Sequence, residues 1–153
     1  MNNVYQLLKS AIERYIEETK LLIDQLTNQI LLDEPVQSGR PLGEIFLHMI
    51  RSIEYYLQGV INDHWEPLTY NLKTYNSVED IINLYDDVSQ KAKDYLEKLP
   101  PTTLFDLYND FNRPATKAEM LLEMLEHNIQ HRGQILVYYR LLGVTPAKLP
   151  YIV

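Results

Sequence analysis

Four long segments of this 153-residue chain repeat apolar residues at steps of three and four. That spacing places the apolar side chains on one face of an α-helix. No segment shows the strict alternation that is typical of a half-buried β-strand. The pattern therefore predicts an all-α fold, a four-helix bundle in a single domain spanning residues 1–153. The expected helices run from about Asn3 to Leu32, from near Pro41 to Asn62, from Ser77 to Leu99 and from Thr116 to Leu142.

Residues typical of helix ends separate these segments. Thr116 with Glu119 has the spacing of a capping box, and Ser77 with Asp80 resembles one. The links after the second and third segments are long enough to cross an end of the bundle, so simple up-down-up-down connectivity does not follow. The link 102–115 has room for a short strand or a 3₁₀ turn and for nothing larger.

Charge and composition exclude several classes of function. The net charge is −7 at pH 7 and no basic cluster stands out, so binding to nucleic acid phosphates is not expected. The chain has no Cys, which excludes disulfides, thiolate ligands and a cysteine nucleophile. No apolar run approaches the roughly 20 residues that a membrane span needs, and no secretory signal is seen. We therefore expect a cytoplasmic protein without a membrane partner.

The fourth segment carries polar residues in the middle of an apolar stripe. Positions 120, 124, 127, 131, 134, 138 and 141 follow heptad spacing, which predicts one core-facing stripe. Its ends are apolar, and its middle is His127, His131 and Gln134. A neighbouring stripe that includes Leu122 and Ile129 is apolar too. We therefore expect both imidazoles to be buried and to need bonding partners.

A metal ion would satisfy these histidines. His127 and His131 are four residues apart, so both imidazoles can bind one ion from a single helix. His48 lies beside the apolar stripe of the second segment and can join them across the bundle. Three histidine ligands would leave a position open for water or substrate. Spacing alone leaves two alternatives open: core histidines bonded to carboxylates, and a polar layer that fixes the register of the bundle.

Two stretches, 41–49 (PLGEIFLHM) and 126–134 (EHNIQHRGQ), resemble the DinB-like superfamily of four-helix proteins. The resemblance covers essentially the whole chain and is most specific in the run 131–134. It implies a nickel or zinc site at His48, His127 and His131, long crossover connections and frequent homodimers. A related branch in ergothioneine synthesis has a carboxylate where this chain has Gly133, so we reject that branch.

The resemblance also implies a class of chemistry. Characterised relatives include thiol S-transferases that use bacillithiol-type cofactors and a thiol-dependent isomerase. The leading interpretation is a divalent-metal-dependent thiol S-transferase acting on a small-molecule substrate, with a metal-dependent hydrolase as its nearest variant. The thiol would come from a small molecule, because the chain has none. The alternatives are a non-catalytic stress-response protein in which the metal staples the bundle, and a dimerisation module without metal; catalysis itself stays open.

Three polar residues could support the ligands. Glu44 and Glu123 each precede a candidate ligand by four residues and could orient an imidazole, although a solvated helix carboxylate is the favoured interpretation for both. Gln134 lies in the heptad stripe and could bond to a ligand or to water held at the site.

The remaining candidates have simpler interpretations. Arg132 is expected in a salt bridge across the bundle or a dimer contact rather than on an anionic substrate. Gly133 costs about 1 kcal/mol relative to Ala inside a helix, and we expect it to permit close helix approach near the metal. His64 is expected to be a surface histidine. The tyrosines that could line a pocket, although they are more often core residues, are Tyr55, Tyr56 and Tyr138.

Overall fold

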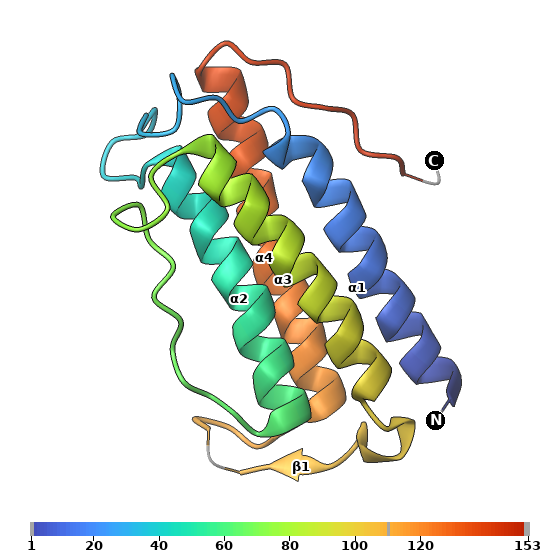
Figure 1. The fold of residues 1–153 in the computed structure, drawn as a ribbon. Coiled ribbons are helices and arrows are strands. Elements are labelled where there is room, and N and C mark those ends of the chain that lie inside the picture. Colours follow the sequence, from blue (N-terminus) through green and yellow to red (C-terminus); the bar gives the residue numbers. More distant parts are fainter. Residues whose placement is uncertain (1, 110, 152–153) are drawn as a thin grey trace.

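A computed structural model describes residues 2–109 and 111–151 and contains, in that part of the chain, a bundle of four helices (Figure 1). No described helix combines the length and the apolar character that crossing a membrane requires. The all-α four-helix prediction is confirmed, and the link before the last helix holds both a 3₁₀ turn and a short strand pair. The elements are α1 Asn2–Ile23, α2 Leu42–Asn62, α3 Val78–Lys98, η1 Pro101–Thr103, β1 Leu107–Tyr108, β2 Ala115–Thr116 and α4 Lys117–Leu141.

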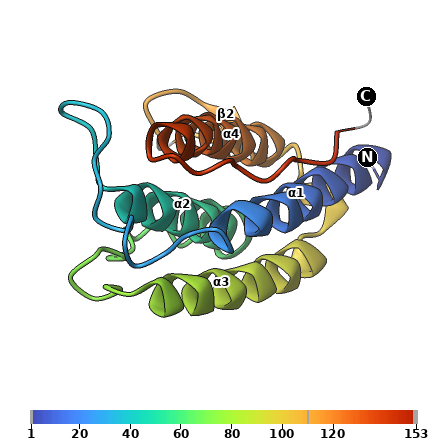
Figure 2. The same cartoon turned by 90° about the horizontal axis from the view of Figure 1, so that it is seen from above.

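The helices α1 and α4 run in one direction, and α2 and α3 run in the other (Figure 1). The Tyr5 hydroxyl near the start of α1 donates to the Leu96 carbonyl near the end of α3, as antiparallel neighbours require. The link 63–77 therefore returns along the length of the bundle and is a long crossover, whereas the link 99–116 stays at one end. Seen from above, α4 and α3 lie on opposite sides of α1 and α2 (Figure 2).

Both predicted capping boxes form. The Ser77 hydroxyl accepts from the Asp80 N–H at 3.1 Å, and the Asp80 carboxylate accepts from the Ser77 N–H at 3.1 Å. At α4 the Thr116 hydroxyl accepts from the Glu119 N–H at 3.2 Å, and Glu119 accepts from the Thr116 N–H at 2.7 Å. Each cap is worth about 1 kcal/mol, so these local bonds fix where α3 and α4 begin.

The end of α1 differs from the prediction, because the helix stops at Ile23 and not at Leu32. The chain continues in turns, in which the Leu26 N–H donates to the Ile23 carbonyl at 3.0 Å and the Ile30 N–H donates to the Thr27 carbonyl at 3.2 Å. Leu26 remains buried. Successive turns of this kind also bring apolar residues inward every three or four positions. The helix-like spacing of apolar residues therefore continues beyond Ile23, although the helix does not.

The buried stripe of α4 is displaced from the predicted stripe. Leu122 and Ile129, expected in the core, are 47% and 49% exposed, and Gln134 and Leu141 are exposed as well. The core accepts polar residues instead, because each has partners there: the Asn128 amide donates to the Met124 carbonyl at 2.8 Å, for example. Met120, Met124 and Tyr138 of the predicted stripe are buried as expected. The full set of buried residues on α4 is Ala118, Met120, Leu121, Met124, Leu125, Asn128, Arg132, Ile135, Tyr138 and Tyr139.

Candidate metal centre

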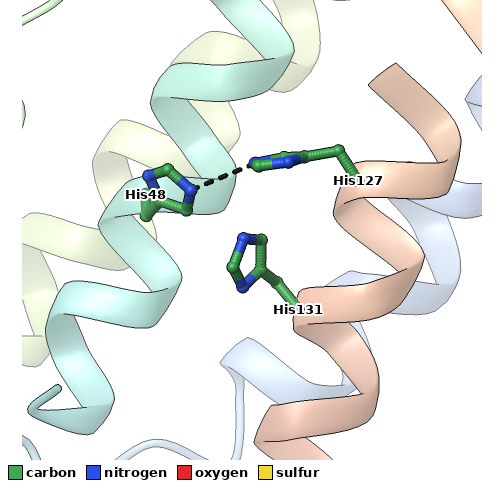
Figure 3. A group of neighbouring side chains, drawn as sticks. All are labelled: His48, His127 and His131. Atoms are coloured by element: carbon green, nitrogen blue, oxygen red, sulfur yellow. Dashed lines mark hydrogen bonds between the residues drawn. The ribbon is translucent and has the colours of Figure 1, made fainter. Parts of the chain in front are cut away.

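Three imidazoles meet in the space between α2 and α4 (Figure 3). One nitrogen each of His48, His127 and His131 lies within 4.8 Å of the others. The Nε2 atoms of His48 and His127 are 3.0 Å apart, and the ring of His131 is centred 4.6 Å from each of the other two rings. The structure thus brings together the three residues that the sequence singled out. The sequence predicted that His127 and His131 are buried, but all three histidines are only half-buried. His127 and His131 lie beside the buried stripe of α4 and not within it.

The donor set fits a divalent ion such as zinc. Nitrogen ligands at about 2.0–2.1 Å from zinc in a tetrahedral site lie about 3.3 Å apart, close to the 3.0 Å between His48 Nε2 and His127 Nε2. Imidazole is also a suitable ligand for nickel. Three neutral nitrogens leave the charge of the ion uncompensated, which favours an anionic ligand in a remaining position.

The surroundings of His48 and His127 favour the neutral form of these two imidazoles. Burial lowers the pKa of His48 to about 4, and the positive charges of His131 and Arg51 act in the same direction. Burial also lowers the pKa of His127, with Glu123 opposing the shift. Neutral rings are the form that binds metal, so these two side chains need not lose a proton at pH 7 before they can serve as ligands.

Gln134 fixes the orientation of one ring. Its side-chain oxygen lies 2.7 Å from His131 Nδ1 and accepts the proton of that nitrogen. The Nε2 atom of His131 is then left with a free lone pair. A partner on the outer nitrogen is the usual companion of a metal-binding histidine, because it holds the tautomer and the ring angle.

Arg51 contacts the third ring and was not singled out from the sequence. Its Nη2 lies 3.1 Å from His48 Nδ1. A guanidinium can only donate, so Nδ1 accepts and His48 carries its proton on Nε2, from which it donates to His127. Coordination through His48 Nε2 requires the opposite tautomer and therefore the withdrawal of Arg51. The i,i+3 spacing of His48 and Arg51 on one helix was an available signal for this contact.

The two carboxylates have other partners. Glu44 accepts from the Leu72 N–H at 2.8 Å, and Glu123 accepts from Arg113 at 2.8 Å and from the Tyr56 hydroxyl at 3.2 Å. Within the described chain neither carboxylate bonds to an imidazole. Glu123 is the exposed carboxylate that was favoured, whereas Glu44 ties the crossover link to α2.

A cavity of about 290 Å³ opens beside two of the histidines. Tyr55 and Tyr56 line it together with His48, His127 and Arg51. The cavity gives a small molecule access to the nitrogen atoms of these rings.

Tyr138 lies on the other side of His131. It lines a hollow of about 230 Å³ that also contains His131 and Arg40. Its hydroxyl accepts from the Arg40 N–H at 3.4 Å.

The other residues singled out from the sequence lie away from the histidine cluster. Arg132 pairs with Glu18 across the bundle at 3.1 Å, which confirms the expected salt bridge. A Cβ added to Gly133 would meet nothing within 4 Å in the described part of the chain, so the prediction that another helix of the same bundle approaches it closely is wrong. His64 is on the surface, 3.8 Å from Glu66, as expected.

Comparison with known proteins identifies relatives of the chain. The model of the DinB family matches residues 1–152. YjoA of Bacillus subtilis (strain 168) is 24% identical over 136 residues, which cover 87% of this chain and 86% of YjoA. The crystal structure of YjoA, a DinB-like protein, aligns with a TM-score of 0.77 at 21% identity, covering 95% of this chain and 96% of that one. A DinB-like protein from Bacillus cereus ATCC 10987 gives a TM-score of 0.78 at 22% identity, covering 94% and 95%. These structural matches support the fold.

Proposed function

The chain belongs to the DinB family, and we propose that it binds zinc or nickel through His48, His127 and His131. The observation that carries this proposal is the convergence of three imidazoles from α2 and α4 beside a cavity. Neutral rings, the bond from His131 to Gln134 and the short distance between His48 and His127 all suit a divalent ion.

We propose further that the site acts on a small molecule, with transfer to or from a thiol as the reaction class and hydrolysis as its nearest variant. A divalent ion held there would supply a Lewis acid and lower the pKa of a thiol or water in the open position. Arg51 lines the cavity and adds positive charge, which favours a thiolate over a neutral thiol. Tyr55 and Tyr56 shield one wall from water. The thiol is external, because the chain has no Cys.

One experiment tests the metal site. Protein purified without a metal-affinity tag is incubated with zinc or nickel, desalted and examined by elemental analysis. We expect one ion per chain in the wild type and in His64→Ala, whose ring lies outside the cluster, and none in His127→Ala. Metal below stoichiometry in the wild type would overturn the proposal.

A second experiment separates a reactive site from a structural staple. Cobalt replaces the bound ion, and a small thiol such as 2-mercaptoethanol is added. In an open site the thiolate ligates cobalt and changes its visible spectrum. An unchanged spectrum at saturating thiol would favour the alternative, a non-catalytic metal-binding protein.

We also propose that the chain forms a homodimer through the outer face of α4, which comprises Leu122, Glu126, Ile129, Gly133, Val137 and Arg140. Three apolar side chains on this face are about half exposed, and the position of a Gly133 Cβ is free of contacts. The face is self-complementary about Gly133, since Ile129 and Val137 lie equally far on either side of it, as do Glu126 and Arg140. Two antiparallel copies of α4 crossing at Gly133 therefore pair unlike charges and apolar residues.

Charge reversal tests this pairing. Light scattering after size exclusion should show a dimer for the wild type. Glu126→Arg and Arg140→Glu should each weaken it about fivefold, and the double variant should restore it, because the pair is exchanged and not removed. A monomeric wild type, or a double variant weaker than both single variants, would contradict the proposed interface.

A further inference from the structure

A second cavity lies beside the histidine cavity and is walled by aromatic rings. We call it the aromatic cavity; its volume is about 500 Å³, and its lining includes Tyr55, Tyr56, Trp65 and Phe111. The Trp65 ring is centred 4.8 Å from the ring of Phe111 and 5.5 Å from that of Tyr55, both at steep angles. Edge-to-face packing is an arrangement that aromatic rings prefer, so it holds the rings that line the cavity in fixed positions.

Trp65 is held in place by α2. Its ring covers Gly59 so closely that a Cβ at this position would collide with it. The indole Nε1 is buried and has no hydrogen-bond partner within the described chain. The tryptophan is therefore held by packing against α2 and the neighbouring rings and not by a hydrogen bond of its indole nitrogen.

The charges at the rim of the aromatic cavity compensate each other. Arg113 pairs with Glu123 at 2.8 Å, and Glu123 also accepts from the Tyr56 hydroxyl. The cavity therefore favours an uncharged, apolar group. The neighbouring histidine cavity differs, because Arg51 lies in its wall and no carboxylate among the described residues lines it; Glu44, 4.0 Å from Arg51, lies outside that lining.

The two cavities share a wall formed by Tyr55 and Tyr56. We propose that they bind one elongated ligand, whose aryl ring occupies the aromatic cavity and whose anionic end reaches the histidines. The placement of the anionic end rests on the proposed metal site, whereas the binding of the ring does not. The ligand class is therefore an arene that carries a carboxylate or thiolate on a short chain.

Trp65 is the sole tryptophan of the chain and reports on its own cavity. The probe is 4-(4-nitrophenyl)butanoate, whose nitroaryl ring quenches indole fluorescence on contact. We expect saturable quenching in metal-free protein, with an affinity about tenfold lower in Phe111→Ala, because one ring of the wall is lost. Phe105→Ala removes an exposed ring outside the cavity lining and serves as the matched control with wild-type affinity. Absence of saturable quenching, or equal affinities in both variants, would overturn the aromatic site.

Zinc then tests the anionic end. Loading the wild type should raise its affinity for the probe about tenfold over the metal-free wild type, and His127→Ala should show no rise over its own metal-free affinity. Loaded protein without this rise would refute the two-cavity ligand. If no zinc binds at all, the proposed function fails while quenching in metal-free protein still supports the aryl site, so the two failures are distinguishable.

Discussion

His131 and Arg132 are neighbours on α4, but they place polar groups in two different kinds of environment. Arg132 points toward α1, where its Nη1 lies 3.1 Å from Glu18 and its guanidinium lies over the ring of Tyr15 at 5.0 Å. His131 lies near α2, half-buried, with its ring close to those of His48 and His127. The arginine is closed in and paired, whereas the histidines keep nitrogen atoms facing one another beside a cavity.

This difference shows how polar residues that stabilise the bundle can be distinguished from polar residues that are available to bind a ligand. A buried ion pair with its partner in place contributes to the fold and has no capacity left for a ligand. A cluster of histidines whose nitrogen lone pairs are unused stabilises the fold little by itself, and a bound metal ion would stabilise it much more. Stability and ligand binding should therefore respond to different residues of α4, and the following changes test that division.

The largest effect is expected from Arg132→Ala, which leaves the buried Glu18 carboxylate with the longer, solvent-exposed ion pair to Arg14 at 3.8 Å. The free energy of unfolding should fall by about 3 kcal/mol, at the lower end for a broken buried pair. Urea denaturation of metal-free protein measures it. His131→Ala should cost about 1 kcal/mol under the same conditions, because its ring is only half-buried.

A double variant is the control for this prediction. Glu18→Leu with Arg132→Met replaces the ion pair by apolar side chains and should recover most of the lost stability. If His131→Ala and Arg132→Ala destabilised the metal-free protein equally, the division between the two sides of α4 would be wrong.

The second effect is the stabilisation of the fold by metal. Zinc at about 100 times its dissociation constant should raise the free energy of unfolding by about 2.7 kcal/mol, provided that it binds only the folded chain. His127→Ala should show no such rise, and Arg132→Ala should show the full rise from its lower starting point. Thermal unfolding with and without zinc measures both, and a rise in His127→Ala would mean that the ion binds elsewhere.

The sequence predicted those features of the fold that depend on interactions within one helical turn. The capping boxes at Ser77 and Thr116 act within one helical turn, so α3 and α4 begin where expected. The end of α1 was missed, because consecutive turns repeat apolar residues at helix-like spacing. The buried stripe of α4 was displaced, because a buried Asn128 and Arg132 become acceptable only through partners on other helices.

The same limit applies to the site. His127 and His131 lie on one helix, so their joint position follows from spacing. His48 lies on another helix, so its position beside an apolar stripe made it only a candidate, and the family resemblance implied it as the third ligand. Trp65 and Arg113 come from links between helices, and their positions depend on how those links pack. No spacing rule connects such residues to the histidines, so the aromatic cavity emerged only from the structure.

The third prediction concerns Arg51, whose guanidinium opposes the tautomer of His48 that would bind metal through Nε2. Arg51→Met keeps the apolar stem and removes the donor. Zinc affinity should rise about tenfold, since contacts on the outer nitrogen of a ligand histidine change affinity by 10–100-fold. Competition with a chromogenic chelator measures it. Arg40→Met, which removes a nearby positive charge that is not bonded to His48 Nδ1, is the matched control for charge alone.

The fourth prediction is a decrease in zinc affinity. Gln134→Ala removes the acceptor from His131 Nδ1, and water can replace it because Gln134 is exposed. Zinc affinity should therefore fall by no more than about tenfold. Gln134→Glu retains an acceptor oxygen and should bind at least as tightly as the wild type. Equal losses in both variants would show that Gln134 does not act through that bond.

The smallest effect is the pH dependence of stability in the metal-free protein. The pKa of His48 is about 4 in the folded chain and 6.5 ordinarily. Between these values the unfolded chain binds a proton at this ring and the folded chain does not, so the free energy of unfolding falls as the pH drops from 6.5 toward 4. The loss from pH 6.5 to pH 5 should be about 1 kcal/mol, because solvent screening at a half-buried ring roughly halves the full linkage value. Carboxylates titrate in the same range, so the measured quantity is the difference between the wild type and His48→Leu, which should have the shallower pH dependence. Identical pH profiles of the two proteins would mean that His48 is as well solvated as an ordinary histidine, and the histidine side of α4 would then lack the partial burial on which its contrast with Arg132 depends.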